Sequence, residues 1–213
     1  AFVPDRMAVE VAPDGDIVPG QPYKLPVTAR FLYGAPAANL TGHATMRLVP
    51  DPTPPAALAG YRVGVEGEEF APDNQEIELP DTDAQGRTTL PVLIRKAPDS
   101  TRPIRAEIDV SVDDPSGRAA HAKASIPVRA AGTLIGMKPG FDGAIDADAE
   151  AGFDIAAVSP AGQRIAVPAR LRLVRERPDW RMVVRGSLAR YETVYRDEVI
   201  EASDVLIPAD APL

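Results

Sequence analysis

The sequence contains no cysteine, and this absence removes several kinds of chemistry at once. A chain without cysteine forms no disulfide bond, has no thiol nucleophile and holds no metal through thiolates. Histidine is scarce as well, since only His43 and His121 are present. Neither belongs to a signature of a Ser-His-Asp site, in which a third group holds a base against a nucleophile. We expect both at the surface or edge of a strand, and we assign no catalytic residue and no enzymatic activity.

Basic charge and long apolar runs are lacking too. Lys and Arg number 23 against 31 Asp and Glu, and a net charge of −8 lacks the basic surface of nucleic-acid-binding proteins. No apolar run approaches the roughly 20 residues of a membrane-spanning helix. The glycine-rich phosphate loop, the dinucleotide-binding fingerprint and the zinc-protease helix are missing. The sequence therefore predicts no cofactor, no nucleic-acid partner and no direct membrane insertion.

What the sequence does contain is a repeated alternation of apolar and polar residues, which is typical of strands with one buried face. Such runs occur at residues 7–11, 25–31, 61–65, 77–79, 90–94, 104–112, 126–128, 153–157, 171–173, 180–184, 191–199 and 205–207. The 23 prolines are scattered and suit strand ends and loops. The pattern predicts an all-β fold of two consecutive antiparallel β-sandwich domains of immunoglobulin or fibronectin type, with no long helix. Small residues at Ala130-Ala131-Gly132 place the domains at residues 1–130 and 131–213.

Two acidic segments have both a metal-binding and a structural interpretation. Residues 81–86, DTDAQG, begin like a calcium-binding loop, but Val92 stands where the bidentate Glu belongs and no helices flank it. We expect a hairpin turn there, joining strands 77–79 and 90–94. A second acidic run contains Glu66, Glu68, Glu69, Asp73, Glu76 and Glu78. Such runs hold a cation less often than they form a solvated strand edge that discourages aggregation. No metal ligand is assigned.

Three of the few aromatic residues, Trp180, Tyr191 and Tyr195, lie in the second half. They form either an exposed binding platform or part of a core. Because aromatic side chains dominate core packing and few are available, we expect them in the second core or in the interface between the two domains.

Several stretches resemble the macroglobulin-like domains of bacterial α2-macroglobulins. Residues 31–40, FLYGAPAANL, resemble the "YGxPxxG" turn of these domains, with a strand ending at Tyr33 and a return strand from His43. The segments Phe2–Arg6 and Leu79–Gly86 also resemble the bacterial versions. Further resemblance lies in the second half, at residues 135–143 (IGMKPGFDG), residues 171–177 (LRLVRER), Trp180 and Tyr191-Glu192. Together these stretches are spread over nearly the whole chain.

The resemblance implies a function that the residues alone do not. Such proteins are large periplasmic, usually lipid-anchored protease traps, in which cleavage of a bait segment triggers a rearrangement and a thioester in a separate domain couples to the protease. This chain has no cysteine for a Cys–Gln thioester and no recognisable bait region. The resemblance therefore implies the fifth and sixth macroglobulin-like domains, a scaffold part of a broad-spectrum endopeptidase inhibitor. The implied partners are neighbouring domains of the parent chain, with target proteases met only through the full-length protein.

Other interpretations stay open beside this one. The family continues past the position of Leu213 into a further strand, so we expect a second domain truncated at its C-terminal end, with an unpaired sheet edge. A generic bacterial surface or adhesin β-sandwich is the alternative function. A carbohydrate-binding accessory domain that uses Trp180 and the tyrosines is a third.

Overall fold

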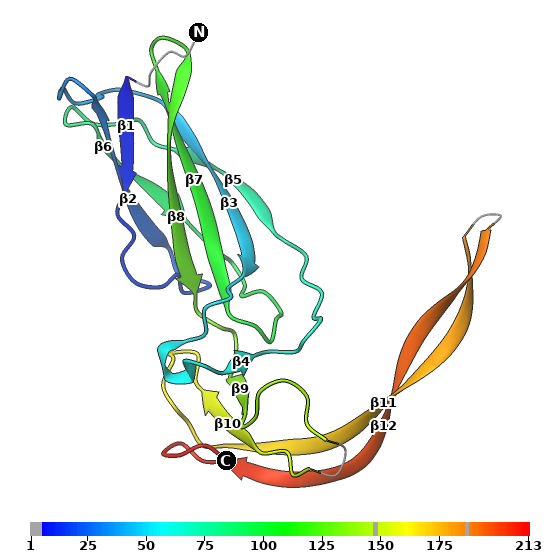
Figure 1. The fold of residues 1–213 in the computed structure, drawn as a ribbon. Coiled ribbons are helices and arrows are strands. Elements are labelled where there is room, and N and C mark those ends of the chain that lie inside the picture. Colours follow the sequence, from blue (N-terminus) through cyan, green and yellow to red (C-terminus); the bar gives the residue numbers. More distant parts are fainter. Residues whose placement is uncertain (1–5, 147–148, 186–187) are drawn as a thin grey trace.

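The computed structural model describes residues 6–146, 149–185 and 188–213, and its regular secondary structure is almost wholly β-strand (Figure 1). The resemblance at Phe2–Asp5 lies outside these residues. One short 3-10 helix, η1 (Ala56–Leu58), interrupts the strands. No helix in the described part of the chain has the length and apolarity needed to cross a membrane. The expectation of an all-β chain is confirmed.

The strands pair antiparallel in every named sheet. They are β1 (Met7–Val11), β2 (Tyr23–Phe31), β3 (Gly42–Pro50), β4 (Arg62–Val63), β5 (Asn74–Leu79), β6 (Arg87–Val92), β7 (Ile104–Asp114), β8 (Arg118–Val128), β9 (Leu134–Pro139), β10 (Phe153–Val158), β11 (Val167–Arg185) and β12 (Leu188–Ile207). The alternating runs of the sequence fall on these strands, because side chains along a strand point in turn to opposite faces.

The first half of the chain is a sandwich of two sheets, ordered β1-β2-β6 and β5-β3-β7-β8. Alternate side chains of each strand point between the sheets. On the central strands these are Leu25, Val27 and Ala29 of β2 and Ala44, Met46 and Leu48 of β3, each no more than 1% exposed. Their burial supplies the hydrophobic stabilisation of this half, and the residues between them face solvent or the sheet edge.

Two predicted connections inside this sandwich are wrong. The turn at residues 81–86 does not make a hairpin, because β5 pairs with β3 and β6 pairs with β2 in the other sheet. The turn after β2 also leads to the opposite sheet, since β3 pairs with β5 and β7 instead of returning along β2. Alternation specifies which face of a strand is buried, but it does not specify the neighbouring strand.

The second half begins with a small sheet, ordered β10-β9-β4, whose last strand comes from the first half of the sequence. Arg62 and Val63 pair with Met137 and Gly136. Leu58 of η1 is fully buried with Leu134, Ala156 and Val158. Residues 56–63 therefore leave the first sandwich and complete the sheet and core of the second half.

The outer edge of β10 is partly covered by backbone hydrogen bonds. Ile155 exchanges two backbone hydrogen bonds with Leu213, at 2.9 and 3.1 Å. Two residues along, the Ile165 N–H donates to the Ala157 carbonyl at 3.1 Å. The chain covers this edge because it turns back on itself after β10 and again after β12. The expectation of an unpaired edge in the second domain named no strand, and it stays a prediction.

The rest of the second half is a long two-stranded hairpin of β11 and β12 (Figure 1). Its base packs against the small sheet, where Ile207 and the partly buried Val167 and Ala169 contact Ile155 and Ala157. Beyond the base, the hairpin curves away from the rest of the molecule, as Figure 1 shows. The second half is thus a two-layer structure near the hairpin base, and a single two-stranded layer beyond it.

Candidate interaction surface

The outer half of the β11–β12 hairpin presents three aromatic residues to solvent. Trp180 is 68% exposed, Tyr191 75% and Tyr195 63%. The prediction that they lie in the second core or between the domains is therefore wrong. Within the described part of the chain, the hairpin meets another layer of the structure at its base, near Val167 and Ile207.

These aromatic residues share one face of the hairpin. Residues directly opposite each other on paired strands point to the same side. The register pairs Met182 with Tyr191 and Pro178 with Tyr195, and it places Trp180 opposite Thr193. We call this side the apolar hairpin face, defined by Pro178, Trp180, Met182, Val184, Tyr191 and Tyr195. None of these six side chains carries a charge at neutral pH.

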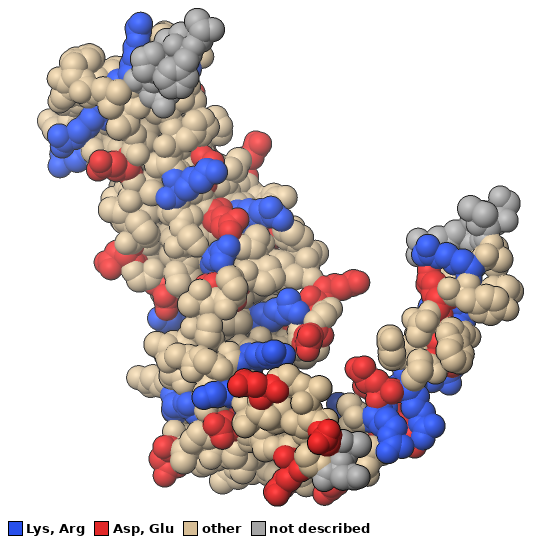
Figure 2. All heavy atoms as spheres, viewed as in Figure 1, with Lys and Arg blue, Asp and Glu red and all other residues tan. Residues whose placement is uncertain are grey.

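The opposite side of the same strands is charged. Arg177 binds Glu198 at 2.5 Å, and Arg196 binds Asp179 at 2.8 Å. In Figure 2, basic and acidic side chains gather on the hairpin where it leaves the rest of the molecule. Exposed ion pairs of this kind add only about 0–1 kcal/mol each. Their main consequence is that one side of the hairpin is charged and the other is apolar.

A β-bulge brings the aromatic residues to one side. The register passes from Leu173 opposite Glu201 to Val174 opposite Val199, which leaves Ile200 as an extra residue on β12. A shift of one residue moves every later side chain of a strand to the other face. If the register of Leu173 opposite Glu201 continued with Ile200 paired to Val174, Tyr191 and Tyr195 would lie on the charged side. Sequence reasoning singled out the aromatic residues but missed Pro178, Met182 and Ile200, because no local signal marks a bulge.

The two histidines lie on the outer face of the four-stranded sheet, one on each side of Ser111. Both are exposed, as expected. The Nδ1 of His121 lies 3.1 Å from Oδ1 of Asp109. Ser111 is only 2% exposed, and its Oγ has no hydrogen-bond partner among the described residues. A nucleophilic serine needs a base within hydrogen-bond reach, so these residues do not form a Ser-His-Asp site.

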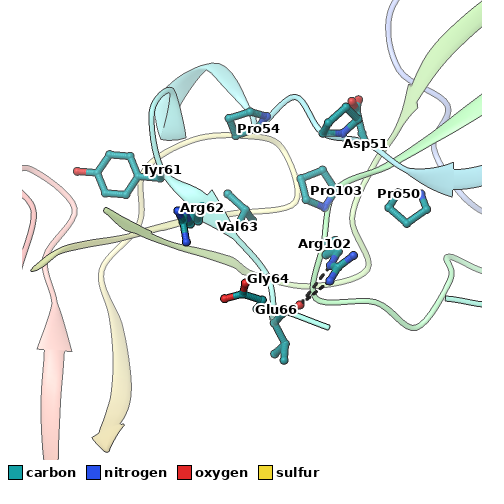
Figure 3. A pocket seen from close by; sticks show the side chains of 12 residues that line it. Pro50, Asp51, Pro54, Tyr61, Arg62, Val63, Gly64, Glu66, Arg102 and Pro103 are labelled. Carbon is teal, nitrogen blue, oxygen red and sulfur yellow. Dashed lines mark hydrogen bonds between the residues drawn. The ribbon is translucent and has the colours of Figure 1, made fainter. Parts of the chain in front are cut away.

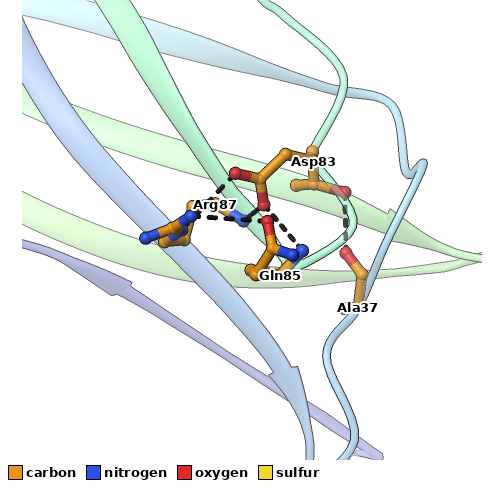
Figure 4. A network of polar contacts seen from close by, with 5 residues as sticks. Ala37, Asp83, Gln85 and Arg87 are labelled. Atoms are coloured by element: carbon orange, nitrogen blue, oxygen red, sulfur yellow. Dashed lines mark hydrogen bonds and ion pairs between the residues drawn. The ribbon is translucent and has the colours of Figure 1, made fainter.

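The calcium-like segment is a turn in which the carboxylate of Asp83 is already engaged (Figure 4). Oδ1 of Asp83 accepts hydrogen bonds from the backbone N–H groups of Gln85 and Arg87, both at 2.8 Å. These backbone donors, with Arg87 the larger contributor, lower the pKa of Asp83 below its ordinary value. Gly86 follows with φ of 74°, and a Cβ there would collide with the backbone carbonyl of Ala29.

The acidic run follows its structural interpretation. Glu76 and Glu78 are exposed on β5, which is an edge strand of the four-stranded sheet. Glu68 accepts hydrogen bonds from the hydroxyl of Ser100 at 2.5 Å and from the backbone N–H of Thr101 at 3.1 Å. The Ser100 hydroxyl is the main cause that lowers the pKa of Glu68. Within the described ranges, no three His, Asp or Glu side chains are placed to hold a metal ion.

A hollow of about 560 Å³ lies where the first sandwich meets residues 61–66 (Figure 3). Its wall includes Pro50, Pro54 and Pro103, which offer no backbone N–H. The guanidinium of Arg102 is engaged, because its Nε and Nη2 donate to the Val65 carbonyl at 3.2 and 2.9 Å. This hollow is a gap in the packing between the first sandwich and residues 61–66.

Comparison with known families decides what kind of protein carries these features. The model described as "Bacterial Alpha-2-macroglobulin MG5 domain" matches residues 5–129, and that described as "Bacterial macroglobulin domain 6" matches residues 136–213. The chain belongs to the bacterial α2-macroglobulin family. The resemblance found in the sequence is therefore confirmed, including the assignment to the fifth and sixth domains.

Solved structures of bacterial α2-macroglobulins are similar to this macroglobulin chain over its whole length. Salmonella α2-macroglobulin reacted with methylamine shares 25% identity with it, with a TM-score of 0.74. The native conformation of Escherichia coli α2-macroglobulin shares 23%, with a TM-score of 0.71. Both matches cover 100% of this chain but only 15% and 14% of those proteins. The chain thus spans about one seventh of the length of these relatives. A comparison with curated proteins found no match.

Proposed function

We propose that this chain is a scaffold portion of a broad-spectrum protease inhibitor, a periplasmic and lipid-anchored protein of the α2-macroglobulin type. The observation that carries the proposal is the consecutive match of both halves to the fifth and sixth macroglobulin domains. It is supported by a likeness, with a TM-score of 0.64, to Escherichia coli α2-macroglobulin activated by porcine elastase.

The proposed role is positional and not catalytic. The carboxylates of Asp83 and Glu68 accept hydrogen bonds within their own turns, and Ser111 lacks a base. The chain would instead fix the geometry of neighbouring domains through its packed sheets. Its partners are those neighbours, and target proteases meet it only within the full-length parent. The chain supplies no cysteine, so a Cys–Gln thioester in the parent would lie in another domain.

A protease-protection assay tests the proposal. The full-length parent is mixed with elastase or trypsin, and cleavage of a large protein substrate is followed. We expect the parent to protect the large substrate and the isolated 213-residue chain, shown to be folded by circular dichroism, to give no protection. The physical reason is that trapping requires a cleavable bait and a mobile body, and this chain provides only part of the body. Stoichiometric protection by the isolated chain would contradict the scaffold role.

The alternative is a surface or adhesin binding module, and the exposed apolar hairpin face favours it to a limited extent. The two functions differ in what surrounds the chain in the parent. An α2-macroglobulin parent contains many further macroglobulin-like domains, whereas an adhesin repeats one module beside a surface anchor. The full gene sequence, read together with the protection assay, separates them.

A further inference from the structure

The apolar hairpin face is a large unpartnered surface. Trp180, Met182 and Val184 of β11 are 68%, 57% and 61% exposed, and Tyr191 and Tyr195 of β12 are 75% and 63% exposed. Single exposed apolar residues are ordinary on protein surfaces, but a contiguous patch of this kind marks an interaction site. A two-stranded hairpin alone is marginally stable in water, so a second layer over this face would also stabilise the hairpin.

The apolar side chains are gathered on one face of the outer hairpin. Charged residues fill the other side of the same strands, where Arg177 and Arg196 bind Glu198 and Asp179. The bulge at Ile200 places both tyrosines beside Trp180 and Met182. A bulge disrupts a ladder locally and is commonly found where a strand must re-aim its side chains. An uncharged face opposite a charged one indicates that the first faces protein and the second faces water.

We infer that the apolar hairpin face docks onto another domain of the same parent polypeptide. The inference rests on the proposed function only for the multidomain nature of the parent. About six sevenths of the length of the α2-macroglobulin relatives lies outside the region that this chain matches. The rest of such a parent polypeptide therefore offers many surfaces on which this face can dock. The docked surface must itself be apolar, because the face offers neither charge nor a dense set of hydrogen-bonding groups.

The size of the face favours a partner in the same polypeptide over a second copy. Residues 178–184 and 191–195 cover roughly 24 by 10 Å, from the strand rise and spacing. Two copies face to face would bury roughly 500–800 Å² in total, below the roughly 1,200 Å² of a stable association. Contact within one polypeptide starts from a high effective concentration, so a patch of this size is adequate there.

Cysteine labelling in the full-length parent tests the inference. Met182→Cys places a thiol on the apolar face, and Arg181→Cys places one on the charged face one residue away. Labelling rates with a maleimide are read by mass spectrometry of the hairpin peptide and divided by the rates in urea. We expect Met182→Cys to react at least tenfold more slowly than Arg181→Cys. Equal normalised rates would overturn the inference.

A second variant tests whether the aromatic side chains make the docking face. In the Met182→Cys parent, Trp180→Ser removes the largest side chain of the face and keeps the register and the bulge, and we expect labelling to accelerate at least fivefold. Circular dichroism and protease resistance report whether the rest of the parent stays folded. Acceleration by Tyr195→Ser, opposite Pro178 on the same face, provides an independent check. If neither variant accelerates labelling, the face is not the docked surface.

The labelling experiment gives a different result if the apolar hairpin face binds a second copy of the chain or a glycan. Slow labelling that depends on protein concentration, together with a dimer in sedimentation, would assign the face to a second copy and overturn the inference. Slow labelling that appears only after addition of a soluble glycan would overturn it in favour of carbohydrate binding. A parent that does not inhibit proteases but keeps Met182→Cys protected would remove the proposed function and support the docking. The docking of the apolar hairpin face and the proposed scaffold function can therefore be contradicted independently of each other.

Discussion

Asp83 shows how a single carboxylate organises a connection between two sheets. The chain crosses from β5 to β6 through residues 80–86. In this crossover, the carboxylate of Asp83 accepts hydrogen bonds from the backbone N–H groups of Gln85 and Arg87. The neighbouring Thr82 hydroxyl donates to the Ala37 carbonyl at 2.6 Å and accepts from the Leu40 N–H at 2.9 Å. These bonds attach the crossover to the loop after β2. Asx turns of this kind explain why Asp and Gly recur in a segment that resembles a calcium loop.

The lowered pKa of Asp83 gives a pH-dependent prediction. A carboxylate whose pKa is lower in the folded state stabilises the fold above its unfolded pKa of about 3.9, and this contribution is lost as the pH falls through the folded value. We expect Asp83→Asn to lower Tm at pH 7 and to have a smaller effect at pH 3, since protonation of the Asp83 carboxylate begins to remove the same contribution from the unsubstituted chain. Thermal unfolding at both pH values measures this. Glu78→Gln, an exposed carboxylate on β5, is the control.

At the scale of elements, Gly136 of β9 allows residues 56–63 to pack against the second sheet. A Cβ at this position would lie 2.9 Å from Cβ of Tyr61 and 3.1 Å from Cδ2 of Leu58. The same junction is held by Arg164, whose Nε donates to the Ala57 carbonyl at 3.0 Å and whose guanidinium lies 5.4 Å from the Tyr61 ring centroid. A small residue is needed here because two backbones approach closely.

We expect Gly136→Ala to destabilise the protein by about 1–3 kcal/mol, because the added methyl group overpacks this contact. Gly132→Ala is the matched control, since a Cβ at Gly132 meets nothing within 4 Å. Urea unfolding of the two variants measures the difference. Equal stabilities would show that residues 56–63 move aside without cost.

At the scale of the whole molecule, two cores share one segment of chain. The core of the first half runs from Met7 to Val128, whereas Leu58, from within that span, is buried with Leu134 and Val158 of the second half. Residues 56–63 can reach the second core only while both of their ends are fixed in the first sandwich. The two halves are therefore expected to unfold together.

This coupling predicts one cooperative calorimetric transition for the folded chain. Leu58→Ala should lower stability by about 2–5 kcal/mol, through lost burial and the cavity it leaves. It should also raise hydrogen exchange in β9 and β10, far from it in sequence. Leu93→Ala, at a position 43% exposed, is the control and should have little effect. Two separate transitions in the unsubstituted chain would contradict the coupling.

Much of the fold was predictable from local patterns. The alternating runs around Leu25, Leu90 and Ile108 identify strands and their buried faces, because a strand in a half-buried sheet repeats every two residues. The turn at Asp114–Gly117 joins β7 to β8 as its residue types indicate, with the Gly117 N–H donating to the Asp114 carbonyl at 2.9 Å. Family membership was also within reach, since it depends on short motifs in a fixed order.

Only the tertiary structure decided which elements meet. The sequence by itself determined most of the β-strands, the buried faces in the first sandwich and the absence of thiol chemistry, because these depend on residue type and on a period of two. The pairing of β4 with β9, the separation of β5 from β6, and the bulge at Ile200 depend on contacts between residues far apart in the chain. Those contacts are selected by the packing free energy of the whole molecule, which no local pattern encodes. For the same reason, the sequence contained Trp180 and the two tyrosines, but only the fold placed them on one exposed face.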